Sequence, residues 1–135
     1  MTASVFADTA YYVAEVSPKD TLHAVARAFT MAYTGRLVTT EFVLVEVANF
    51  LIKGDGRAAY IDLMRNLRDD LQTTILPASP ELFERGLKLF AARPDKEWSL
   101  TDCISFEVMT ELGLTDALTS DHHFEQAGFC ALLKP

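Results

Sequence analysis

Four acidic residues have types and positions that suit the binding of a divalent cation. They are Asp8, Glu46, Asp102 and Asp121. Magnesium takes oxygen ligands, and carboxylates gathered at one place raise one another's pKa unless a cation offsets their charge. A bound divalent ion lowers the pKa of its water and stabilises the charge that develops on a phosphodiester. If the fold brings these side chains together, the chemistry they favour is metal-dependent phosphodiester hydrolysis.

The three aspartates also have purely structural explanations. Asp8 could cap the helical turn that follows it, and Asp102 could close a capping box with Ser99. Asp121 could cap the short segment after it or form an Asx turn. Taken one at a time, each aspartate favours the structural role, so the functional interpretation depends on finding them together.

Glu46 is harder to explain as a structural residue. Its segment is rich in apolar residues, namely Phe42, Val43, Leu44, Val45, Val47, Ala48, Phe50, Leu51 and Ile52. This composition predicts a helix that is buried on most sides, where an unpaired carboxylate is strongly unfavourable. Asn49 and Lys53 could form a polar stripe that leads Glu46 to solvent. A cation close to the carboxylate is the alternative that the sequence favours.

Strand and helix patterns alternate along the chain and would position these acids. Apolar or β-branched runs predict strands at residues 3–7, 37–39, 73–76, 117–119 and 129–132. Between them, helices are predicted from Ser17 and Pro18 to about 35 and at 41–53, 57–71, 80–92, 99–113 and 122–126. The alternation predicts an α/β fold, a single α/β/α sandwich built on a parallel sheet, with residues 1–135 as one domain. Function in such sheets collects at the carboxyl ends of the strands, where Asp8 and Asp121 would lie.

Composition limits the class of protein. The chain has 135 residues, half of them hydrophobic, and a net charge of −7. No run approaches the roughly 20 apolar residues that a membrane span needs, and no basic stretch precedes an apolar run at the start, so we expect a cytoplasmic protein. The negative charge argues against bulk electrostatic coating of nucleic acid, although a cation-binding acidic site is compatible with it. Cys103 and Cys130 are each expected to be buried free thiols.

Several segments, in order and spacing, resemble the PIN-domain family and in particular its VapC-type toxins. They are residues 6–9, 39–47, 99–105, 119–124 and 128–129. The resemblance implies a Rossmann-like, five-stranded parallel sheet with the order 3-2-1-4-5. It also implies that the four acids form a site for Mg²⁺ or Mn²⁺, with Asp121 binding directly or through water. Thr9 or Ser120 would assist by hydrogen bonding, and the phase of the match favours Glu46 over the nearby Glu41.

The activity implied by the resemblance is cleavage of single-stranded RNA by a metal-activated water that attacks phosphorus in line. No protein nucleophile is needed for this reaction. Among the scattered basic residues, Lys53 and Arg57 lie close enough in sequence to the Glu46 segment to contact an RNA backbone. Because adjacent helical residues point about 100° apart, we do not expect His122 and His123 to share one ion.

The resemblance also implies partners. A lone domain of this size is similar to the toxin of a toxin–antitoxin pair, which implies a cognate antitoxin and a homodimer. Tyr11, Tyr12 and the apolar positions of residues 22–29 could form the antitoxin groove, or they could belong to the core.

Alternatives remain open at this point. The chain could be a PIN-fold RNA-processing nuclease outside a toxin system, or a non-catalytic scaffold that binds RNA or protein. A haloacid-dehalogenase phosphatase would need an aspartate where Ala10 stands. A receiver domain would need a preceding acidic pair and a late lysine, and neither pattern is evident.

Overall fold

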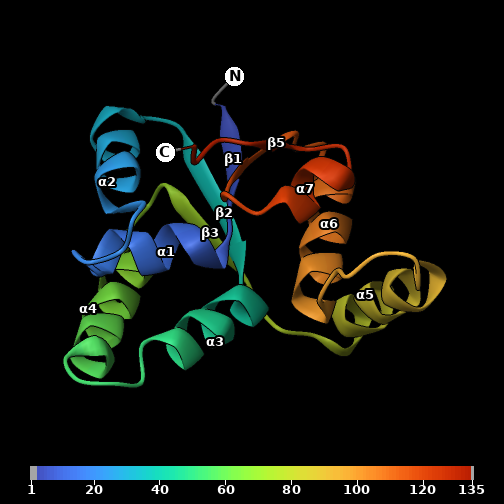
Figure 1. Ribbon diagram of the computed structural model, residues 1–135, viewed down its shortest axis with the longest axis horizontal. Coiled ribbons are helices and arrows are strands. Elements are labelled where there is room, and N and C mark those ends of the chain that lie inside the picture. The colour runs from blue at the N-terminus through green and yellow to red at the C-terminus, as the bar shows by residue number, and fades with distance from the viewer. Residues whose placement is uncertain (1–2, 135) are drawn as a thin grey trace.

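A computed structural model describes residues 3–134, in which five strands form one parallel sheet (Figure 1). The strands are β1 (Ser4–Ala7), β2 (Arg36–Thr40), β3 (Thr73–Leu76), β4 (Asp116–Leu118) and β5 (Cys130–Ala131). Their order across the sheet is β3-β2-β1-β4-β5, and each neighbouring pair is parallel. The predicted fold class and strand order are therefore confirmed.

Helices lie on both sides of this sheet. They are α1 (Thr9–Val16), α2 (His23–Ala32), α3 (Glu41–Phe50), α4 (Gly56–Asp69), α5 (Pro80–Ala92), α6 (Leu100–Leu112) and α7 (His122–Gln126). Figure 1 shows α1, α2 and α4 to the left of the strands and α5, α6 and α7 to the right. Each parallel connection needs such a crossover, which is why the helices cover both faces.

The central strand β1 is the point at which the strand order reverses. It pairs with β2 on one side and β4 on the other, with Phe6 opposite both Val38 and Ala117. The Asp8 N–H donates to the Leu118 carbonyl at 3.2 Å, so the first residue after β1 lies against the end of β4. Such a switch point forms a crevice at the carboxyl edge of the sheet, where ligands bind in folds of this class.

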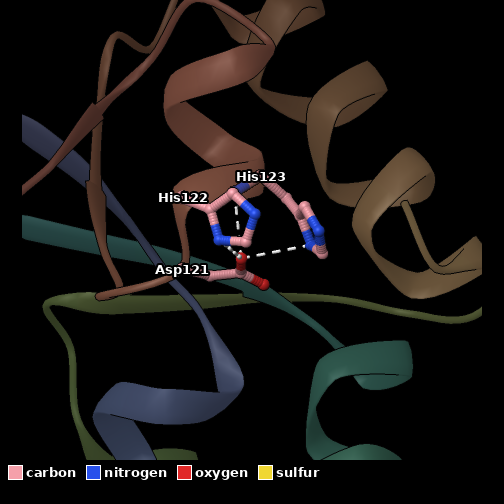
Figure 2. Close-up of side chains that lie close together, drawn as sticks. All are labelled: Asp121, His122 and His123. Carbon is pink, nitrogen blue, oxygen red and sulfur yellow. Dashed lines mark hydrogen bonds and ion pairs between the residues drawn. The ribbon is translucent and has the colours of Figure 1, made fainter. Parts of the chain in front are cut away.

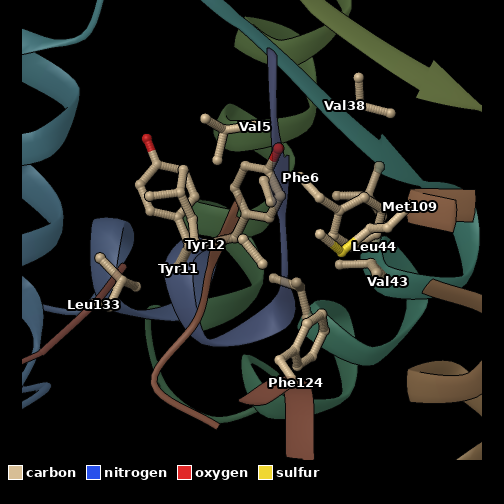
Figure 3. Close-up of a cluster of buried hydrophobic side chains, with 14 of the residues drawn as sticks. Val5, Phe6, Tyr11, Tyr12, Val38, Val43, Leu44, Met109, Phe124 and Leu133 are labelled. Carbon is tan, nitrogen blue, oxygen red and sulfur yellow. The ribbon is translucent and has the colours of Figure 1, made fainter. Parts of the chain in front are cut away.

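The sheet is held by a core that includes residues on either side of β1 (Figure 3). Phe6, Leu44, Met109 and Phe124 have at most 2% of their surface exposed, and burying each such side chain is worth about 1.5–3 kcal/mol. Tyr11 and Tyr12 are likewise buried, which supports the core explanation for these two tyrosines. The core therefore joins β1 to the helices α3, α6 and α7.

The structure corrects the predicted start of the second helical segment. Ser17 ends α1, residues 18–22 form turns, and α2 begins only at His23. The Asp20 carboxylate accepts the Leu22 N–H at 2.9 Å, while the Asp20 N–H donates to the Ser17 carbonyl at 3.0 Å. These local bonds form an Asx turn that competes with helix, so the prediction of Ser17 as an N-cap was wrong.

Two burial predictions were also wrong. The helix around Glu46 ends at Phe50, and Val45 and Phe50 are 61% and 67% exposed, so α3 is buried along one stripe rather than on most sides. Cys103 is buried as expected, but Cys130 is exposed at the edge strand β5. Within residues 3–134, no helix combines the length and hydropathy that crossing a membrane requires.

Candidate active site

Asp8 lies at the carboxyl end of β1 and faces the end of β4. Its Oδ2 atom accepts a hydrogen bond from the Thr119 hydroxyl at 2.8 Å, and the side chain is almost fully buried. Asp8 occupies the N-cap position of α1, yet its carboxylate makes no capping bond within the described chain. The capping explanation for this residue therefore fails, and the carboxylate is instead bonded to Thr119, the residue that follows β4.

Glu46 reaches the same place from α3. Its Oε1 atom accepts a hydrogen bond from the Thr9 hydroxyl at 2.6 Å, which ties α3 to the first residue of α1. Glu41, one turn earlier on α3, is exposed and accepts the Ala78 N–H at 2.7 Å. Of the two glutamates, the structure places Glu46 beside Asp8 and its neighbour Thr9.

Asp102 and Asp121 do perform the structural roles that the sequence suggested. Asp102 and Ser99 form a capping box at the start of α6, with bonds of 3.2 and 3.0 Å. The Asp121 Oδ1 atom accepts the His123 N–H at 2.9 Å and caps α7. Each cap engages one carboxylate oxygen, so capping does not prevent the other oxygen from binding a cation.

A cavity of about 360 Å³ opens where these elements meet. Asp8, Thr9, Glu46, Ser120 and Asp121 contribute to its lining. Asp102 is not part of the lining but is electrostatically close, because its charge raises the pKa of Asp8. The structure thus brings together the four acids that the sequence singled out.

The electrostatics of the cluster favour a bound cation. The pKa of Asp8 is raised to about 7, mainly by burial and to a smaller extent by the charges of Asp102 and Glu46, although hydrogen bonds from the Thr119 hydroxyl and the Thr9 N–H lower it. Burial also raises the pKa of Asp102, with added contributions from the charges of Asp121 and Glu46. A divalent ion would offset this repulsion, and an all-oxygen donor set fits Mg²⁺ or Mn²⁺.

The raised pKa of Asp8 predicts how stability depends on pH without metal. Between about pH 4 and about 7, the folded chain keeps a proton on Asp8 that the unfolded chain has lost. Stability should therefore fall as pH rises through this window, by at most about 1.4 kcal/mol per pH unit for this group. Urea denaturation in EDTA across the window would measure it. In Asp8→Asn this part of the slope should vanish, and an unchanged slope would contradict the assignment.

Thr119 was not singled out from the sequence, and His123 was considered there only together with His122. Thr119 is fully buried; its hydroxyl donates to Asp8 and accepts the Asp121 N–H at 3.0 Å, so it links two of the acids. The Nδ1 atom of His123 lies 3.1 Å from Asp121 Oδ1 and 3.5 Å from Asp102 Oδ2. Thr119 lies at the end of a predicted strand, two residues before Asp121. This position was the signal in the sequence that could have identified it as a site residue.

The two basic residues assigned to RNA differ in their placement. Lys53 and Lys19 line a cavity of about 320 Å³, and the exposed Phe50 lines both this cavity and the acidic one. The Arg57 guanidinium donates to the Ile52 carbonyl at 3.2 Å and lines neither cavity. Cationic side chains thus lie next to the acidic cleft through Lys19 and Lys53.

The chain belongs to the PIN-domain family, whose sequence profile matches residues 5–129. It is similar to VapC20 of Mycobacterium tuberculosis, which is named a 23S rRNA-specific endonuclease. The two are 25% identical over 125 residues, covering 93% of this chain and 95% of VapC20, in both strain CDC 1551 and strain H37Rv. The predicted family is therefore confirmed.

A solved structure supports the fold independently. The crystal structure of M. tuberculosis VapC20, described as a Sarcin-Ricin loop cleaving toxin, superimposes with a TM-score of 0.84 at 24% identity. The match covers 93% of this chain and 95% of VapC20. The PIN-like arrangement of helices and strands therefore extends over nearly the whole chain.

Proposed function

We propose that this PIN-domain protein is a metal-dependent endoribonuclease that cleaves single-stranded regions of RNA. The observation that carries the proposal is the cluster of four carboxylates at the switch point of the sheet, where burial and mutual repulsion raise the pKa of Asp8 to about 7. Buried acids whose pKa is raised in this way are typical of functional sites. Phosphodiester hydrolysis is the reaction that such a site supports best.

In this proposal the four acids hold Mg²⁺ or Mn²⁺. Asp8, Glu46 and Asp102 form the core ligand set, and Asp121 binds directly or through water. When bound, the ion supplies an activated water nucleophile and stabilises negative charge on the phosphate and the leaving oxygen. Thr9 and Thr119 fix the orientation of the Glu46 and Asp8 carboxylates through the bonds described above, as partners of ligating carboxylates do. Ser120 adds a hydroxyl to the cleft.

The neighbouring basic cavity suits the RNA backbone. Lys53 and Lys19 would attract phosphates on one side of the acidic cleft, and Arg57 would contribute from the start of α4. The net charge of −7 favours such a local contact over broad electrostatic binding. In this proposal the substrate would lie across α3, next to Glu46.

We further propose that the protein is the toxin of a toxin–antitoxin pair and acts in the cytoplasm. The support is its likeness to VapC20, which is described as a toxin, along 95% of that protein. A cognate antitoxin and a homodimer are part of this proposal, as the resemblance to VapC-type toxins implies. RNA cleavage that is unaffected by any protein encoded next to this gene would favour an RNA-processing nuclease instead.

The ligand role of Glu46 has a matched control on the same helix. Glu46→Gln is expected to weaken Mn²⁺ binding and to lower RNA cleavage by at least about tenfold, because it removes a charged ligand. Glu41→Gln should change neither, since Glu41 bonds to the Ala78 N–H outside the cleft. Calorimetric titration with Mn²⁺ and a cleavage assay would compare the two. Equal effects of both substitutions, or no effect of either, would refute this role.

A further inference from the structure

Asp121, His122 and His123 come together at the start of α7, beside the acidic cleft (Figure 2). Each offers one possible ligand atom, and these atoms lie within 4.8 Å of one another. The two imidazole rings lie side by side, with centroids 4.3 Å apart and planes inclined by 46°. The structure thus brings the two rings together, although adjacent helical residues were not expected to share one ion. Figure 2 shows both rings beside the Asp121 carboxylate.

The distances suit a small transition-metal ion. Nδ1 of His123 lies 3.1 Å, and Nδ1 of His122 3.7 Å, from the same Asp121 oxygen, Oδ1. Ligand atoms about 2.0–2.1 Å from a tetrahedral ion are about 3.3 Å apart, a value between the two observed distances. The three groups can therefore surround one ion if their ligand atoms, which lie within 4.8 Å of one another, adjust toward this spacing.

One nitrogen of the cluster lacks a hydrogen-bond partner. Nδ1 of His123 is buried, and no atom of residues 3–134 makes a hydrogen bond to it of acceptable geometry. Most buried polar atoms are bonded, so an unbonded one needs an explanation. The nearby Asp121 carboxylate is held in position, because its Oδ1 atom accepts the backbone N–H of His123. A cation between the ring and the carboxylate would satisfy this nitrogen.

We propose that Asp121, His122 and His123 form a second metal site, which takes a borderline transition ion such as Zn²⁺. Imidazole nitrogen suits Zn²⁺, Cu²⁺ and Ni²⁺, whereas Mg²⁺ takes oxygen ligands. The site is thus chemically distinct from the four-carboxylate site, but it shares Asp121 with it. Three protein ligands leave one tetrahedral position for water or for an anion such as a phosphate oxygen.

The shared aspartate couples the two sites. A Zn²⁺ ion on Asp121 Oδ1 leaves the other oxygen of this carboxylate to the Mg²⁺ or Mn²⁺ site but places a second divalent charge beside it. Because the two ions repel each other, zinc should inhibit cleavage that depends on Mg²⁺. This consequence rests on the proposed ribonuclease function, whereas the binding of zinc does not. Zinc binding therefore provides a test that holds even if the chain cleaves no RNA.

The test is a calorimetric titration of the full chain with Zn²⁺ in excess Mg²⁺, which occupies the oxygen site. The exposed Cys130 is replaced by serine throughout, because a free thiol could itself bind zinc. We expect one Zn²⁺ per chain. His122→Gln and His123→Gln should each weaken binding at least about tenfold, since loss of even an outer-shell partner typically costs that much.

His23→Gln is the matched control, because His23 lies on α2 and its Nδ1 atom contacts the Ala14 carbonyl at 2.6 Å. It should leave the zinc affinity unchanged. His122 is largely exposed, so its substitution should not disturb folding, which far-ultraviolet circular dichroism would verify. Zinc binding that survives both His122→Gln and His123→Gln, or the absence of stoichiometric binding to the parent chain, would overturn the proposal.

Discussion

Replacing Asp8 with asparagine is expected to reduce metal-dependent RNA cleavage at least about a hundredfold, beyond the 10–100-fold typical of losing an outer-shell partner. Asparagine keeps an oxygen that can accept the Thr119 hydroxyl, so the local geometry should persist. What is lost is the negative charge at the centre of the carboxylate cluster. Initial cleavage rates with Mn²⁺, compared with those of the parent chain, would measure the effect.

The same substitution should make the metal-free chain more stable near neutral pH. Burial raises the pKa of Asp8 to about 7, so ionising it in the folded state is unfavourable, and an amide avoids that cost. Asp116→Asn is the matched control, because Asp116 starts β4 at the opposite edge of the sheet. It should leave cleavage unchanged. Full activity of Asp8→Asn would contradict the proposed site.

Asp102 allows its structural and chemical roles to be separated. Asp102→Asn should also reduce cleavage at least about a hundredfold, because it removes a second charge of the cluster while keeping an oxygen for the capping box. Ser99→Ala removes the other half of the same box and leaves the carboxylate in place. That variant should lose about 1 kcal/mol of stability and retain most of its cleavage activity.

The pair of variants is informative because Asp102→Asn is expected to reduce cleavage, whereas Ser99→Ala is expected to reduce stability and to spare cleavage. Urea denaturation and cleavage rates, measured on both, would show whether activity follows the charge of Asp102 or the integrity of the cap. If Ser99→Ala lost as much cleavage as Asp102→Asn, the aspartate would act only by holding the start of α6. The proposed ligand role would then be wrong.

Many of the strands and helices could be predicted, because the sequence patterns that specify them are local. The apolar run that ends at Asp8 predicted β1, and the helix starts predicted at residues 80 and 99 agree with the structure to within one residue. The strand order came from the resemblance of several segments to one family, since propensity alone carries no information on which strands are neighbours. Asp20 shows the limit of a local rule, because its side chain forms a turn where the pattern suggested the first turn of a helix.

The finer features of the site depend on contacts between distant segments. Thr119 and Asp8 are 111 residues apart in sequence, and only the pairing of β1 with β4 brings them within hydrogen-bonding distance. His122 and His123 converge through their side-chain torsions, which backbone periodicity does not describe. The exposure of Val45 and Phe50 depends on which elements pack against α3. The number of hydrophobic residues in the helix does not reveal those neighbours.

The central claim is tested most directly by incubating the purified chain with a mixed pool of structured RNAs, with Mn²⁺ or with EDTA, alongside Asp8→Asn. The account predicts cleavage with Mn²⁺, none in EDTA, recovery when Mn²⁺ is returned in excess, and none by Asp8→Asn under any of these conditions. Cleavage that persists in EDTA, or that Asp8→Asn performs as well as the parent chain, would contradict a metal-dependent reaction at these carboxylates.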